Sequence, residues 1–139
     1  MDSYLKKQQE IINTLSDDMI LLPILSDEEN DEQFLEKALK GTRDIIILIV
    51  VDSDSKQEFG FATSQIQKAR SVMEEVTEII GKKRKRYEDI IEWGDTQNKI
   101  LNLALLRKVD KVVLKKQENQ YFEELVKKLK DEKVDVEVI

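Results

Sequence analysis

The sequence has no cysteine and no histidine among its 139 residues. These two absences exclude disulfide bonds, thiol nucleophiles, imidazole bases and zinc sites of the usual kind. Any catalysis would have to run on carboxylates, lysines, hydroxyls or a hard metal ion such as Mg²⁺. We expect no resident cofactor and no metal site.

Long apolar runs are also absent. No run reaches the roughly 18–20 residues needed to span a bilayer, and the first residues are charged and polar, unlike a signal peptide. We therefore expect a cytoplasmic protein with no membrane partner. The net charge is −6, which disfavours nucleic acid and anionic lipid as partners because both attract basic surfaces.

One short segment is exceptionally apolar. Residues Ile45–Val51 are all apolar, nearly all of them are β-branched, and Asp44 and Asp52 flank them. A strand with one wet face would alternate apolar and polar residues, and this segment does not. It therefore predicts a strand buried on both faces, as in parallel sheets that are covered by helices.

Strand and helix patterns alternate along the chain. We expect an N-terminal helical extension over residues 1–16 and one α/β domain over residues 17–139, because a chain of this length forms a single domain. Each of the first four strands is followed by a helical pattern. The expected strands are Met19–Leu25, Ile45–Val51, Tyr87–Trp93, Val112–Leu114 and Val134–Ile139.

The alternation predicts a five-stranded parallel sheet with helices on both faces and right-handed crossovers. The third and fifth strands carry the most charge, so we place them at the edges, which gives the order 3-2-1-4-5. The switch point then lies between the first and fourth strands. Ligands of such sheets bind there, beyond the carboxyl ends of the strands.

The segment between the second and third strands contains a long helical pattern and a basic run. Ser55 with Glu58, or Ser64 with Gln67, fits the capping box that begins a helix. Residues Lys82–Arg86 are all basic. Such a run is either a nucleic-acid patch or a solvated loop, and the acidic remainder of the chain favours the loop.

The order of the elements and several short motifs resemble the universal stress protein family over Asp18–Ile139. The motifs are Met19–Ile24 with its proline, Ile49–Asp52, Gly94-Asp95 at a helix start, and Val109–Leu114. The resemblance implies an α/β sandwich, a homodimer, and a non-enzymatic binding or regulatory role in a stress response.

Two departures from the family pattern concern the nucleotide site. ATP-binding members carry an aspartate just after the proline of the first strand; here Leu25 stands in that place and Asp27 follows two residues later. Those members also hold phosphates on a glycine-rich loop after the fourth strand, whereas Lys115–Asn119 contains no glycine. The resemblance therefore implies that this chain does not bind ATP.

The charged residues left at the predicted carboxyl ends of the strands are the candidate ligand-binding residues. The candidates are Asp27, Asp52, Asp95, Lys115 and Lys116. The two lysines of this set could attract an anion or could be solvated loop residues.

A different function class remains open at Asp52-Ser53-Asp54. Two aspartates directly after an apolar strand are typical of small Mg²⁺-dependent phosphatases, in which one carboxylate attacks phosphorus. The further acid expected after Asn98 is replaced by Lys99. The alternative is that Asp52 is a turn residue.

The last strand offers an interaction surface. Val134, Val136 and Val138 alternate with acidic residues and form one apolar row at a sheet edge. The family resemblance implies that this strand pairs with a second copy of the chain, and the N-terminal helix could add to that interface. We expect a homodimer; a further protein partner is possible.

Overall fold

The computed structural model of the protein describes residues 17–53 and 60–139. The predicted N-terminal helix and the Ser55 capping box lie outside the described residues. The elements are β1 (Asp17–Pro23), α2 (Glu32–Ala38), β2 (Thr42–Val51), the 3₁₀ turn η1 (Thr63–Gln65), α3 (Ile66–Gly81), β3 (Arg86–Trp93), α4 (Thr96–Leu106), β4 (Lys111–Leu114), α5 (Gln120–Asp131) and β5 (Val136–Val138).

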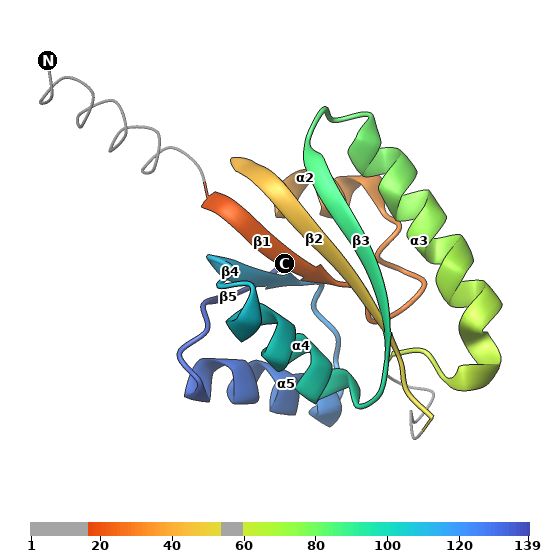
Figure 1. The fold of residues 1–139 in the computed structure, drawn as a ribbon, viewed down its shortest axis with the longest axis vertical. Coiled ribbons are helices and arrows are strands. Elements are labelled where there is room, and N and C mark those ends of the chain that lie inside the picture. Colours follow the sequence, from red (N-terminus) through yellow and green to blue (C-terminus); the bar gives the residue numbers. More distant parts are fainter. Residues whose placement is uncertain (1–16, 54–59) are drawn as a thin grey trace, which may run out of the picture.

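The strands form one five-stranded sheet in the order β3-β2-β1-β4-β5, and every pair is parallel (Figure 1). This order confirms the 3-2-1-4-5 prediction. Pro23 is the last residue of β1, where its missing N–H costs least. The register places Leu22 beside Ile47 and Val112 beside Val136.

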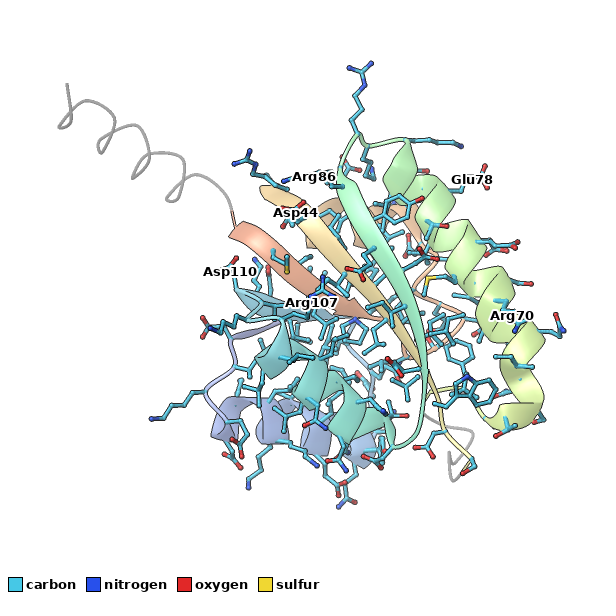
Figure 2. The ribbon with its side chains drawn as sticks, viewed as in Figure 1. Asp44, Arg70, Glu78, Arg86, Arg107 and Asp110 are labelled. Carbon is cyan, nitrogen blue, oxygen red and sulfur yellow. The ribbon has the colours of Figure 1, made fainter. Side chains whose placement is uncertain are left out.

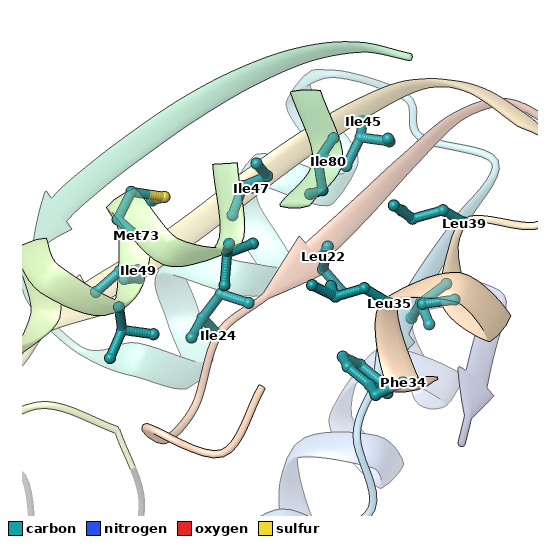
Figure 3. Packing of buried hydrophobic residues seen from close by; sticks show 14 of the residues in the cluster. Leu22, Ile24, Phe34, Leu35, Leu39, Ile45, Ile47, Ile49, Met73 and Ile80 are labelled. Carbon is teal, nitrogen blue, oxygen red and sulfur yellow. The ribbon is translucent and has the colours of Figure 1, made fainter. Parts of the chain in front are cut away.

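Two apolar cores lie on the two faces of the sheet. Alternate residues of β2 point to opposite faces, because the side-chain period of a strand is two. Ile45, Ile47 and Ile49 pack with α2 and α3 (Figure 3). Ile46 and Leu48 pack with α4 and α5. Both faces of β2 are therefore buried, as the unbroken apolar run predicts.

Three of the described α-helices begin at a capping side chain. The side chains of Asp31, Asp95 and Asn119 cap α2, α4 and α5 by accepting backbone N–H groups. Gly41 follows α2 with a φ of +77°, a conformation that glycine adopts without strain. Among the described helices, none is long and apolar enough to cross a membrane.

Two details of the helices were not given by the sequence. The capping box expected at Ser64 and Gln67 is not formed, because Ser64 lies inside η1 and α3 begins at Ile66; the Ala62 N–H instead donates to the Gln65 side chain at 2.9 Å. The apolar pattern of α4 also did not indicate that Leu105 is 47% exposed. A short helix with apolar residues around most of its circumference does not reveal which side faces the sheet.

Ile47→Asp is expected to abolish cooperative folding. Ile47 is fully buried at the centre of β2, and an unpaired buried carboxylate costs several kcal/mol against a total stability of roughly 5–15 kcal/mol. Thermal denaturation followed by circular dichroism checks this. Leu106→Asp, at a side chain that is 77% exposed, is the control and should melt cooperatively. A cooperative transition of Ile47→Asp would contradict the packing described here.

Candidate functional site

The strand order reverses between β1 and β4, and this is the switch point of the sheet. The loop after β1 leads to α2 on one face, and the loop after β4 leads to α5 on the other (Figure 1). Loops that diverge in this way leave a crevice at the carboxyl ends of the strands, where α/β sheets of this kind bind ligands. The side chains of these two loops therefore determine which ligand could bind in the crevice.

The carboxylate of Glu29 lies in the first of these loops and is fully buried. Its Oε1 accepts the backbone N–H of Leu25 at 3.1 Å, and its Oε2 accepts the N–H and the hydroxyl of Ser26 at 2.9 and 2.6 Å. Glu29 is not among the site residues predicted from the sequence. The available signal was its position three residues after Ser26, the spacing of a capping box.

The second loop reaches the same carboxylate. Gln117 Nε2 lies 3.4 Å from Glu29 Oε1, and Asn119 Nδ2 lies 3.3 Å from Gln117 Oε1. Burial raises the pKa of Glu29, while the hydrogen bonds from Ser26 and from the amide of Leu25 act in the opposite direction. Glu29 therefore joins the two loops across the switch point and is exposed to little solvent.

Lys115 also spans the crevice. Its Nζ donates to the carbonyl oxygen of Glu28 at 2.9 Å, lies 3.6 Å from Asp31 Oδ2, and lies 5.7 Å from the centre of the Phe34 ring. These contacts hold the lysine against the loop after β1. Lys115 is thus neither of the two things the sequence suggested, a free anion ligand or a solvated loop lysine.

Asp27 and Lys116 have other partners than Lys115. Asp27 forms an ion pair with Lys68 of α3 at 3.0 Å, and the hydrogen bond from Lys68 lowers the pKa of Asp27. The side chain of Lys116 is exposed, and its backbone N–H donates to the carbonyl oxygen of Ile139 at 2.8 Å. The structure therefore does not gather these two residues into one site with Lys115.

Asp52 and Asp95 do come together, at the start of α4. Asp52 is 6% exposed, and its Oδ2 lies 3.2 Å from the backbone nitrogen of Thr96 and 3.4 Å from the Thr96 hydroxyl. Asp95 caps the same helix by accepting the N–H of Asn98 at 2.9 Å. Burial raises the pKa of Tyr121, and the charges of Asp95 and Asp52 add to that rise. The two aspartates thus fix the end of β2 to the start of α4.

The phosphatase hypothesis gains no support from this arrangement. Asp54 lies outside the described residues. In residues 17–53 and 60–139, no cluster of three or more acidic side chains could hold a metal ion. The carboxylate of Asp52 is engaged by Thr96, as expected for a residue that closes a turn.

The predicted dimer residues lie at the β5 edge of the sheet. Val134 and Val136 pack partly against the core on the α4 and α5 face, and Val136 pairs with Val112 of β4. Val138 is 41% exposed. Two residues of the apolar row are therefore partly buried in the core of the subunit, and the third is exposed on its surface.

Comparison with known proteins gives similarity in structure only. No protein-family profile matches the sequence, and no curated protein matches it.

Several solved structures have the same architecture. A universal stress protein in complex with cAMP aligns with a TM-score of 0.63 and 10% identity, over 89% of this chain and 97% of that one. The universal stress protein from Archaeoglobus fulgidus in complex with dAMP gives 0.58 and 13%, over 90% and 98%. Universal stress protein UspA from Lactobacillus plantarum gives 0.56 and 16%, over 89% and 98%. The chain therefore has the fold of the universal stress proteins.

Proposed function

We propose that this chain is a non-enzymatic binding or regulatory module of the universal stress protein type, that it acts as a homodimer, and that it does not bind ATP in the crevice between β1 and β4. The observation that carries the proposal is the set of hydrogen bonds by which the chain's own side chains link the two loops at that crevice. Glu29 and Lys115 each make contacts there that a bound nucleotide would have to displace.

Glu29 opposes a phosphate group beside the amides of Leu25 and Ser26. The amides of Leu25 and Ser26 are already used by the Glu29 carboxylate. A second anion at this place would meet a like charge at low dielectric and would lose those donors. Each hydrogen bond to a charged group is worth roughly 1.5–3 kcal/mol, so the loss of several donors weakens binding by orders of magnitude.

The nucleotide complexes of the two similar structures do not change this expectation. Those proteins bind cAMP and dAMP, and at 10% and 13% identity they share a fold with this chain rather than a set of side chains. Leu25 is 1% exposed and packs in the core. A ligand therefore finds an apolar side chain where the ATP-binding members carry an aspartate.

Dimerisation through β5 is favoured by the exposed edge of the sheet. An edge strand offers unpaired backbone groups to a partner strand, and a two-fold contact uses the same patch of both subunits. The exposed side chain of Val138 adds apolar area to that patch. We assign the dimer contact to Val134, Val136 and Val138.

Titration with Mg-ATP is expected to leave the crevice unchanged. Backbone amide shifts of Leu25, Ser26 and Gln117, followed by heteronuclear NMR, should not move with ATP, because their neighbourhood is closed by Glu29. The amide of Asn102, a residue whose side chain is on the exposed side of α4, serves as the reference. Saturable shifts at the three crevice residues would overturn the proposal.

Glu29 should give the protein a specific pH dependence. Burial raises the pKa of Glu29 above its usual value of 4.5, so between these two pKa values the folded state binds more protons than the unfolded state. The contribution of Glu29 to the free energy of unfolding is then full below the unfolded pKa and falls as the pH rises through the folded pKa. Urea denaturation at a series of pH values should show this fall in the wild type, and Glu29→Gln should lack it. The control Glu28→Gln, at an exposed side chain, should follow the wild type, and an unchanged profile in Glu29→Gln would contradict the assignment.

Light scattering at high micromolar concentration should give about twice the chain mass of 16.3 kDa. Val138→Lys is expected to shift the mass toward the monomer, because it places a charge in the contact. Leu106→Lys introduces the same charge at an exposed residue of α4 and should leave the dimer intact. A monomeric wild type would refute the dimer.

A further inference from the structure

A basic groove lies at the opposite end of the sheet from the crevice. It has a volume of about 630 Å³ and is bounded by the end of α2 and by the loop between α3 and β3, which lie at the same end of the sheet (Figure 1). Lys37 and Lys40 come from the side of α2, and Lys83 and Lys85 come from the loop. Glu36 is the acidic residue that also lines it.

Two residues of the basic run 82–86 pair with acidic side chains, and two others line the groove. Arg86 binds Asp44 through two nitrogens, at 2.8 and 3.0 Å (Figure 2). Lys82 lies 3.7 Å from Glu78 of its own helix. Lys83 and Lys85 instead line the groove. The run is therefore not a uniform solvated loop, because two of its residues form one wall of a concave surface.

None of the four groove lysines forms an ion pair with an acidic side chain of the described residues. Lys85 Nζ donates to the carbonyl oxygen of Thr42 at 2.7 Å, which fixes its position at the start of β2. The side chains of Lys37, Lys40 and Lys83 make no hydrogen bond or ion pair with any other described residue. Part of their charge offsets the negative carboxyl-terminal ends of α2 and α3, each equivalent to about half a charge. A net positive potential remains in the groove, in a protein whose overall charge is −6.

We propose that this groove binds a small anion that carries two or more phosphate groups. Lysine ammonium groups are compact point charges that bind phosphate well. The volume is in the range of small-molecule sites, about 300–1,000 Å³. Leu39 is the apolar residue of the lining, so the groove offers no aromatic surface to a nucleobase.

The groove is independent of the crevice between β1 and β4. The phosphates of ATP could reach the groove, but its adenine would find no stacking partner there, so ATP should bind no more tightly than tripolyphosphate. The backbone amides whose NMR shifts change on titration distinguish binding in the groove from binding in the crevice. Shifts at Lys40, Gly41 and Lys83 report on the groove, whereas shifts at Leu25 and Gln117 report on the crevice.

The test is an NMR titration of the full chain with tripolyphosphate at about 0.15 M salt, where exposed charges are screened beyond about 8 Å. We expect saturable shifts at Lys40, Gly41, Lys83 and Lys85, and weaker binding of inorganic phosphate. The double variant Lys40→Gln, Lys83→Gln takes one lysine from each wall and should weaken binding by about tenfold or more. Its melting temperature should stay at the wild-type value, because both side chains are at the surface.

The matched control is Lys127→Gln, Lys130→Gln on α5, which lies on the other face of the sheet (Figure 1). It removes the same charge and should change the affinity by less than about twofold. Equal losses in the two double variants, or shifts scattered over the surface, would show an adventitious ion only and overturn the proposal. A short single-stranded oligonucleotide that bound more tightly than tripolyphosphate, and lost binding in the groove variant, would overturn it in favour of nucleic acid.

Discussion

The fold depends on the burial of β2 on both of its faces. Each apolar side chain buried there contributes about 1.5–3 kcal/mol relative to exposure, and the strand pairs with β1 on one side and with β3 on the other. Since neither face of β2 can be left in water, helices must cover both. The parallel crossovers provide this cover, with α2 and α3 on one face and α4 and α5 on the other.

The same topology brings two loops to the switch point, and their side chains link them to one another there. The crossovers from β1 and β4 leave in opposite directions, which is the condition for a ligand site at the switch point. In this chain Glu29 receives the hydrogen bonds that an anionic ligand could use. Gln117 and Lys115 bring the second loop against the first. The contacts at this position are therefore set by the side chains of the two loops, whereas the sheet and helices follow the common fold.

The two ends of the sheet differ in electrostatic character because the helices all run antiparallel to the strands. Helix amino ends lie at the carboxyl ends of the strands, where Asp31 and Asp95 cap them. Helix carboxyl ends lie at the amino ends of the strands, where the lysines of the basic groove gather. Helix dipoles favour this distribution of charge. The positive charge of the lysines beside α2 is larger than the partial negative charge of the two helix ends. This remaining positive charge is the basis for the proposed anion site.

The sequence by itself determined the sheet order, the double burial of β2 and the start of α4 at Asp95, because these follow from the apolar and charged patterns of single elements. An unbroken apolar run, an alternating strand such as Val134–Ile139, and a capping aspartate such as Asp95 each act over a few residues. Tertiary structure alone decided which residues meet across the crossovers. In the sequence, Glu29 is one of several acidic residues in a loop. Only the structure shows that it is buried and that it contacts Gln117 of the loop after β4. Lys37 and Lys83 lie far apart in the chain, and a local pattern carries no information about such a pair. The packing of α2 and α3 on the same face of the sheet is what brings them to one groove.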